Sequence, residues 1–356
     1  MIRATTNGVM KAYRVNLNKS TLRLNSARDT VLTERNFNSY AEDPAAAAQS
    51  FQLRRSFMQV DSQLAISEAV TRKYNTAYSA LDNLVSLIDN TSEGSAMSAI
   101  MTGATATTGS GRTALGQELL QLAESLVETM NCKYGDHFVF SGADGLEVPF
   151  TWQGTGENRQ LLYRGIPIDA AAGSADLETL NYLSTEESRF VDIGIGLEED
   201  ENGDLIKTSA FDSVLQGINA LGYGQDGDGD PQNIVSIIYR MGYILSECDD
   251  ASGEWKVDAN GVSQEVEFKR LMDKFDNAST ALKKEHVHLT TKADYLAKNQ
   301  NLLEDTAYTL NEQIVEIEQC DLADAITSFS WAQYCYNAAL KMGNSILSES
   351  LMDYIR

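Results

Sequence analysis

The chain has 356 residues, of which 51 are acidic and 28 are basic, giving a formal net charge of −23 and a pI near 4.4. So acidic a surface argues against a nucleic-acid-binding protein, because few cations are left to neutralise phosphates. No apolar run reaches the roughly eighteen residues of a membrane span. The first residues, Met1–Asn7, lack the apolar core of a cleaved secretory signal. We therefore expect either a cytoplasmic protein or one exported without signal cleavage.

Cysteine and proline usage both point to an α-helical protein without disulfides. The four cysteines, Cys132, Cys248, Cys320 and Cys335, show no CxxC spacing, which favours small buried apolar residues over redox or metal chemistry. Only Pro44 lies outside the middle of the chain. It follows Asp43, a pair typical of an N-cap and the first residue of a helix.

The N-terminal half contains two heptad patterns. The first steps by four and three through Leu53, Phe57, Val60, Leu64, Ser67, Thr71, Tyr74, Tyr78, Leu81, Val85 and Ile88. The second runs through Leu115, Leu119, Leu122, Leu126 and Met130. Such patterns predict coiled-coil helices. Between them, the Gly- and Thr-rich stretch 94–111 predicts a loop, and Gly135 is a candidate for the residue that ends the second helix.

The C-terminal end repeats this pattern. Its seam runs through Leu289, Ala293, Leu296, Gln300, Leu303, Ala307, Leu310, Ile314 and Ile317, and shifts register after Asp321. No proline or evident cap interrupts more than 60 residues, which predicts one helix roughly 90 Å long that needs a partner along its length.

The N-terminus offers that partner. Val9, Tyr13, Leu17, Leu24 and Val31 form a sparser apolar stripe. Residues 1–40 carry seven bases and two acids, whereas residues 316–356 carry six acids and two bases. We expect these ends to pair as helices, with charge selecting the partner and apolar burial holding it, because surface ion pairs contribute only about 0.3–0.5 kcal/mol each.

The middle of the chain differs in kind. Residues 146–268 carry 24 acids and six bases, with short strand-like runs between Gly, Asp and Pro turns. Helices are predicted at 212–221 and 231–247. The expected fold class is mainly α: a long coiled-coil bundle formed by both chain termini, with an inserted α/β central domain.

No motif in the sequence predicts a catalytic, cofactor or metal site. Asp226, Asp228 and Asp230 resemble the start of a calcium loop, but Pro231 occupies the position of its turn glycine and no Glu follows at the twelfth position. An acidic surface turn is the favoured interpretation, with a weak divalent-cation site as the alternative. His286 and His288 stand two apart and would face different sides of a helix. We expect no enzyme activity and no cofactor.

Four motifs, in order along the chain, resemble the bacterial flagellin family, most closely its hook-associated branch. The first, Asn38 to Ala48, is similar to the family's N-terminal Asn-Ser…Asp-Pro-Ala-Ala-Ala run, and the second, His137 to Gly142, contains a Phe-Ser-Gly motif. The third and fourth are Asp321 to Thr327, similar to Asp-Leu-Ala-Glu-Ala, and Ser350 to Ile355, similar to a terminal Leu-Leu-Asp-Tyr-Leu. Tyr40-Ala41-Glu42 and the cysteines depart from the family pattern.

This resemblance implies an extracellular structural subunit of the bacterial flagellum, secreted by type III export without a cleaved signal, at the junction between hook and filament. Its implied partners are a hook-side junction protein, flagellin, further copies of itself in a helical ring, and a cytoplasmic export chaperone on the C-terminal arm. No nucleic acid or membrane insertion is implied. The residues expected in the assembly interface are Leu17, Leu24, Val31, Leu322, Ile326, Phe329, Tyr336, Leu340, Leu347 and Leu351.

The expected division has three parts. Residues 1–40 with 316–356 form the polymerisation domain, 41–145 with 269–315 a helical bundle, and 146–268 the acidic, surface-exposed insert. Two alternatives stay open: a filament flagellin, which would polymerise by itself, and a cytoplasmic coiled-coil binding module. The Trp331, Tyr334 and Tyr336 aromatics are interpreted as seam or assembly contacts.

Overall fold

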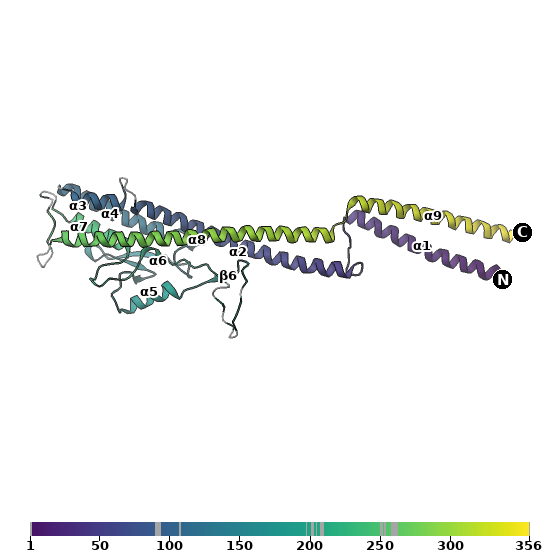
Figure 1. The fold of residues 1–356 in the computed structure, drawn as a ribbon, viewed down its shortest axis with the longest axis horizontal. Helices are drawn as coiled ribbons and strands as arrows, with labels where there is room; N and C mark the ends of the chain where they lie inside the picture. The colour runs from purple at the N-terminus through teal and green to yellow at the C-terminus, as the bar shows by residue number, and fades with distance from the viewer. Residues whose placement is uncertain are drawn as a thin grey trace. The chain divides into compact units, whose positions relative to one another are not determined.

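Long helices from both chain ends and a smaller mixed α/β region make up the fold, which is mainly α with an inserted α/β part (Figure 1). The computed structural model describes residues 2–89, 94–106, 108–196, 198–200, 203, 205–206, 210–249, 252, 254–257 and 263–355, with side chains within 8–345. The chain divides into two compact units. Unit 1 comprises Met1–Ser62 with Leu303–Arg356, and unit 2 comprises Gln63–Leu302.

In unit 1, helices from the two chain ends lie side by side (Figure 1). They are α1 (Ile2–Thr33) and α9 (Leu322–Ile355). Near their free ends Tyr13 meets Gly343, and near their linked ends the Cys320 thiol lies 3.7 Å from the Thr30 carbonyl oxygen. The two helices therefore run antiparallel. The predicted pairing of the chain ends is confirmed.

The C-terminal arm is not one helix. Helix α8 (Gln264–Glu318) stops three residues before α9 begins. The main-chain amide of Asn36 donates to the Glu318 carbonyl oxygen at 2.8 Å, and the Asn36 side chain donates to the carbonyls of Ile317 and Gln319 at 3.1 and 2.9 Å. Asp321 then accepts from the amide of Ala323 at 2.8 Å, which starts α9. The expectation of an uninterrupted helix is wrong, because a segment far away in sequence satisfies the carbonyls that end α8.

Helix α2 (Pro44–Asp89) begins where the sequence predicts. The Asp43 carboxylate accepts from the amides of Ala45 and Ala46 at 3.1 and 3.0 Å, which confirms it as the N-cap. In unit 2 most of the predicted heptad face of α2 is buried. At two of its positions, Tyr78 and Val85, the fully buried residue is instead the preceding one, Ala77 or Leu84. Helix α8 runs antiparallel to α2 in unit 2: Lys283 pairs with Asp89, and further along α8 the His286 ring stacks on Tyr78 with centroids 5.1 Å apart.

The stretch predicted as a loop contains a helix, α3 (Ala96–Thr105), before α4 (Gly109–Met130). Ser95 caps α3 by accepting from the Ser98 amide at 3.2 Å. Ala99, Ile100 and Gly103 are buried. The loop prediction is wrong because tertiary burial of one face of α3 outweighs the weak helix propensity of glycine and threonine.

Gly135 does not end α4, which stops at Met130. It turns a short hairpin between β1 (Lys133–Tyr134) and β2 (His137–Phe138), where its φ of 60° suits glycine. The prediction that it ends the helix is therefore wrong.

Helix α7 (Ile234–Ser246) packs across α4 at two glycines. A Cβ on Gly116 would lie 2.7 Å from the Gly242 carbonyl oxygen, and a Cβ on Gly242 would lie 2.9 Å from the Leu119 Cβ. Asn233 caps α7 by accepting from the amides of Val235 and Ser236 at 2.9 and 3.0 Å. The helix predicted over 231–247 is thus confirmed, whereas the one predicted over 212–221 is limited to Gly217–Leu221, because Phe211–Asp212 pairs as a strand.

The remaining elements are short. Strands β3 (Phe150–Gln153), β4 (Gln160–Tyr163) and β5 (Ile166–Pro167) form an antiparallel meander, and β6 (Phe190–Val191) pairs with β7 (Phe211–Asp212). The 3₁₀ turn η1 (Gly156–Asn158) and helices α5 (Ala175–Thr185) and α6 (Gly217–Leu221) complete the region.

One buried cluster joins these elements to the long helices. It includes Leu81 of α2, Leu126 of α4, Tyr163 of β4, Ile238 of α7 and Phe275 of α8. The segment 146–268 therefore shares its core with the flanking helices, while the three-part division of the chain stays a prediction. None of the helices in the described part of the chain has an apolar stretch that would cross a membrane.

Candidate functional site

The paired helices α1 and α9 bury a narrow face of small and aromatic residues. On α9 that face holds Ala325 and Gly343, which are buried, and Phe329 and Tyr336, which are half-buried. On α1 it holds Leu17, Leu24 and Val31, all half-buried. Small residues allow the two backbones to approach closely, so the pair has a thin core.

Large apolar side chains remain outside this core. On α9 the exposed ones are Leu322, Ile326, Leu340, Trp331, Tyr334 and Met342. At 100° per residue, Leu322 and Leu340 lie on one line along the helix with Ile326 beside it, whereas Trp331 and Met342 lie on the other flank. Two apolar strips thus run along α9, one on each side of its contact with α1.

Trp331 of the second strip also contacts Tyr334, which lies on the side of α9 opposite α1. The rings of Trp331 and Tyr334 stack with centroids 5.8 Å apart, and each side chain is 67% exposed. On α1, Val15 and Leu22 are exposed seven residues apart, on the side away from Leu17 and Leu24. Isolated apolar residues are normal on a surface, but aligned strips mark a contact site.

The residues predicted for the assembly interface divide by exposure. Phe329, Tyr336 and the three α1 positions lie in the α1–α9 contact, whereas Leu322, Ile326 and Leu340 are 43–47% exposed on one flank. Leu347 and Leu351 lie in α9, but their side chains fall outside the described residues. The sequence pattern singled out Trp331 and Tyr334 only as aromatics at helical spacing, and it missed Met342, Val15 and Leu22.

Within 8–345, where side chains are described, the opposite charges of the two ends do not form ion pairs with one another. Among the described side chains, the structure contains no salt bridge between α1 and α9, and Arg28 pairs with its neighbour Asp29 at 3.2 Å. The opposite net charges of α1 and α9 therefore act through a long-range electrostatic field. Such a field steers association more than it adds stability.

A polar cluster in unit 1 links α2 to the C-terminal end of α8. The Glu318 carboxylate accepts two hydrogen bonds from the Arg54 guanidinium at 2.6 and 2.5 Å, and a third from the Ser50 hydroxyl. The bonds from Arg54 lower the pKa of Glu318 to about 2, with Ser50 acting in the same direction and partial burial opposing them. Glu318 is thus a charged structural anchor at the end of α8.

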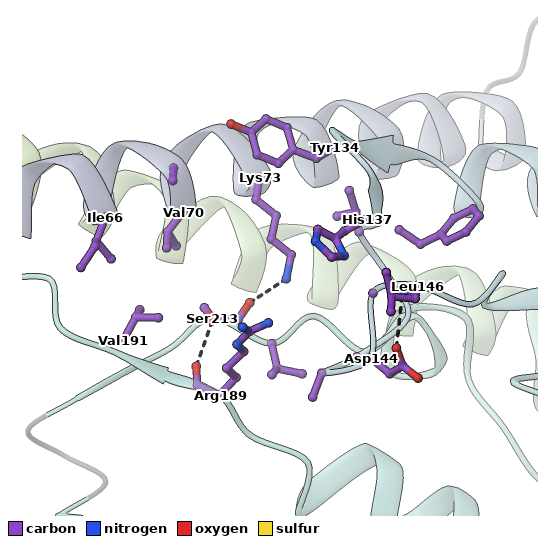
Figure 2. A pocket seen from close by; sticks show the side chains of 17 residues that line it. Ile66, Val70, Lys73, Tyr134, His137, Asp144, Leu146, Arg189, Val191 and Ser213 are labelled. Atoms are coloured by element: carbon purple, nitrogen blue, oxygen red, sulfur yellow. Dashed lines mark hydrogen bonds between the residues drawn. The ribbon is translucent and has the colours of Figure 1, made fainter.

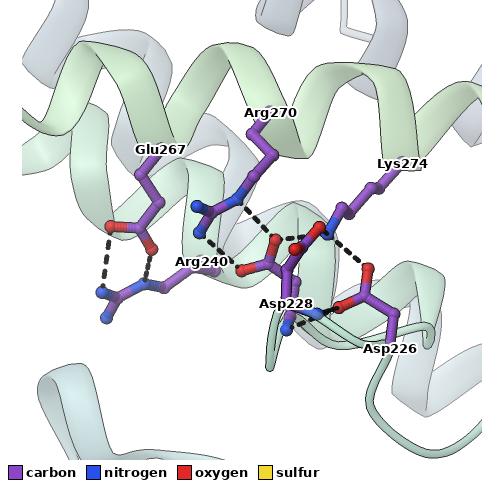
Figure 3. A network of polar contacts seen from close by, with 7 residues as sticks. Asp226, Asp228, Arg240, Glu267, Arg270 and Lys274 are labelled. Carbon is purple, nitrogen blue, oxygen red and sulfur yellow. Dashed lines mark hydrogen bonds and ion pairs between the residues drawn. The ribbon is translucent and has the colours of Figure 1, made fainter.

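The acidic turn that resembles a calcium loop is closed by this chain's own bases (Figure 3). The Lys274 ammonium contacts the carboxylates of Asp226, Asp228 and Asp230, the last two at 3.4 and 2.5 Å. Arg270 holds Asp230 with two bonds at 2.6 and 2.8 Å. Burial lowers the pKa of Lys274, but its hydrogen bonds to Asp226 and Asp230 raise it by more. A lysine from α8 therefore takes the place that a cation would occupy, in keeping with a structural turn.

The chain matches no protein-family model and no curated protein. Among solved structures it is similar to a putative flagellar hook-associated protein from Vibrio parahaemolyticus, at 14% identity, covering 78% of this chain and 100% of that one, with a TM-score of 0.49. It is also similar to Bacillus cereus FlgL, at 16% identity, covering 74% and 99%, with a TM-score of 0.41.

Proposed function

We propose that this chain is a structural subunit of the bacterial flagellum that forms the junction between hook and filament, the role of hook-associated protein 3. The observation that carries the proposal is the pair of terminal helices, whose outer faces expose aligned large apolar side chains. The four sequence motifs and their order along the chain support it. No enzymatic step and no cofactor enter this role.

The exposed strips on α9 explain why the subunit would need neighbours. Fully burying a large apolar side chain contributes about 1.5–3 kcal/mol. Leu322, Ile326, Trp331 and Met342 gain only part of that contribution in one chain. Adjacent copies in a helical ring would cover both flanks of α9, so that the terminal helices gain stability on assembly.

The charges support an ordered arrangement of partners. A basic N-terminal helix and an acidic C-terminal helix would favour neighbouring copies that place helices of opposite charge side by side. Arrangements that bring helices of like charge together would be disfavoured. We infer that the partners are a second junction protein on the hook side and flagellin on the filament side. A cytoplasmic export chaperone would cover the C-terminal arm before assembly. The subunit would then be extracellular after type III export, with its first residues retained.

Deleting the gene tests the proposal at the level of the cell. A junction protein predicts hooks without filaments in electron micrographs and flagellin shed into the medium. The intact chain should also be present in flagella sheared from the parent strain. Filaments of normal length in the deletion strain would refute the junction role, and absence of the chain from sheared flagella would support a cytoplasmic coiled-coil module.

Substitution of Ile326 tests the interface itself. Ile326→Asp would place a charge on an apolar strip, and burying an unpaired charge is costly enough to block a contact. We expect loss of incorporation into flagella with the unit 2 fold unchanged by circular dichroism. Ser330→Asp is the matched control, because it adds the same charge at an exposed polar position of α9. Equal incorporation of both variants would contradict the interface assignment.

Purified protein separates the junction role from that of a filament flagellin. A flagellin would form filaments by itself when seeded, whereas a junction protein would remain limited to short assemblies without its partners. Sedimentation after seeding, followed by electron microscopy, distinguishes the two outcomes.

A further inference from the structure

Unit 2 holds an open cavity of about 490 Å³ that the assembly of the terminal helices does not use (Figure 2). Helix α2 supplies Ile66 and Val70 to its wall, the β1–β2 hairpin supplies Phe138, and Val191 comes from β6. Leu146 closes one side from the loop after β2. Apolar groups therefore line most of the cavity.

The Phe-Ser-Gly motif builds part of this wall and holds it in place. The Tyr163 hydroxyl donates to the Phe140 carbonyl oxygen at 3.1 Å, while Ser141 forms a β-bridge with Gln216. Gly142 has a φ of 80°, and a Cβ there would overlap the Glu187 carboxylate that pairs with Arg164 at 2.8 Å. Because these contacts fix the backbone on three sides, the cavity is formed before any ligand enters.

Two cations face each other at one end of the cavity. Figure 2 shows Lys73 and Arg189 pointing toward one another, and the Lys73 ammonium donates to the Ser213 carbonyl oxygen at 3.0 Å. In the described part of unit 2, neither side chain forms an ion pair. Burial lowers the pKa of Lys73, and the charge of Arg189 lowers it further. The nearby Asp212 offsets part of this, but its Oδ1 already accepts from the amides of Arg189 and Val214, each at 3.0 Å.

This end of the cavity favours an anion. Two adjacent cations beside apolar walls are stabilised when a carboxylate enters between them, because its charge offsets the repulsion between the two cations. The rim favours a macromolecule over a small solute. Leu146 is 71% exposed and Val148 is 45% exposed, so the apolar surface continues outward from the cavity.

The chain's own charge identifies the occupant. With 51 acidic residues and a net charge of −23, each copy carries a large excess of carboxylates, and an apolar recess that holds two facing cations at one end is complementary to them. We propose that this cavity is a docking site for a second copy of this chain, which inserts an apolar side chain flanked by a carboxylate between Lys73 and Arg189. The inference rests on the proposed function, in which copies lie side by side.

Site-specific photo-cross-linking in motile cells tests this docking. A photoreactive phenylalanine analogue replaces Leu146 at the rim, the cells are irradiated, and sheared flagella are separated by mass with peptide identification. We expect a covalent dimer of this chain. The same analogue at Tyr182, which is exposed on α5 and does not line the cavity, is the positional control and should give at most a weak band.

Reversing the charge of Arg189 makes the test specific. Arg189→Glu puts a carboxylate beside Lys73 within the same chain. This carboxylate neutralises the Lys73 ammonium, so neither charge is left unpaired. The Leu146 cross-link should then fall about tenfold, as expected when a close charge contact becomes repulsive. Arg72→Glu is the matched control, since Arg72 pairs with Glu68 on the surface of α2 outside the cavity.

The outcomes separate this inference from the proposed function. If the chain is present in sheared flagella but Leu146 cross-links to another protein or to nothing, the docking inference is wrong and the flagellar role stands. An undiminished dimer in the Arg189→Glu variant also refutes the docking. If the chain is absent from flagella, the proposed function fails and the inference falls with it.

Discussion

Gly343 of α9 lies directly against the phenol ring of Tyr13 on α1. A Cβ at position 343 would overlap that ring, so the close packing of the two terminal helices at this point depends on a residue without a side chain. Tyr13 in turn is half-buried by the contact. This contact limits how closely α1 and α9 can approach near their free ends.

Gly343→Val should separate the two terminal helices. Overpacking of this kind costs about 1–3 kcal/mol, which is large for a pair held by half-buried residues. We expect faster cleavage of both ends in limited proteolysis, which would leave a core near residues 41–315, together with a smaller helical signal in circular dichroism. Gly8→Ala is the control, because no atom lies within 4 Å of a Cβ there and alanine favours helix. Unchanged proteolysis of Gly343→Val would show that the helices have room to move apart without loss.

Gly242→Val should destabilise unit 2 at the crossing of α4 and α7. The added side chain would collide with Leu119 and with the Gly116 carbonyl oxygen, 2.9 and 3.0 Å from its Cβ. Because backbone atoms cannot turn aside, we expect a loss of about 3 kcal/mol or more in the free energy of unfolding. Chemical denaturation followed by tryptophan fluorescence measures it. Gly227→Ala, where a Cβ meets no atom within 4 Å, should change little.

Glu318 should make the junction in unit 1 sensitive to acid. Its pKa falls from an ordinary 4.5 to about 2 in the folded chain. The unfolded chain therefore binds more protons between these values, and the stability that Glu318 contributes is complete above pH 4.5 and lost as the pH falls toward 2. Glu318→Gln should cost about 1 kcal/mol at neutral pH, since Arg54 is half-exposed and solvent screens the pair.

The same experiment carries its own control. The difference in unfolding free energy between the parent and Glu318→Gln should shrink as the pH is lowered from 5 to 2.5, because protonated Glu318 resembles glutamine. A difference that stays constant over this range would mean that the Arg54 contact does not lower the pKa.

Lys274→Ala should convert the acidic turn into a site that responds to cations. The change leaves Asp226, Asp228 and Asp230 close together without the ammonium that contacts all three. We expect a lower melting temperature that millimolar calcium restores in part, since an ion that binds only the folded state stabilises it. The parent should not respond. Lys269→Ala removes an exposed lysine paired with Glu265 and should change neither quantity.

The sequence by itself determined the helical faces wherever a heptad is long and its partner is equally long. Leu289, Leu296 and Leu303 are buried as their spacing predicts, and Pro44 begins α2 with Asp43 as its cap. Local chemistry suffices for these features, because a cap acts within one turn and a repeated apolar face has one low-energy orientation. The pairing of the two chain ends could also be predicted from the sequence, because the two ends carry opposite charges.

Only the tertiary structure decided how closely α1 and α9 approach and where α8 stops. Alanine and glycine form much of the inner face of α9, which turns Ile326 and Leu340 outward although their hydrophobicity alone would place them inside. Asn36 ends α8 from nearly three hundred residues away, beyond the reach of any local pattern. The cavity beside Lys73 likewise requires β6, the β1–β2 hairpin and α2 to meet. These features depend on which surfaces come together, and a helical period specifies a face but not its partner.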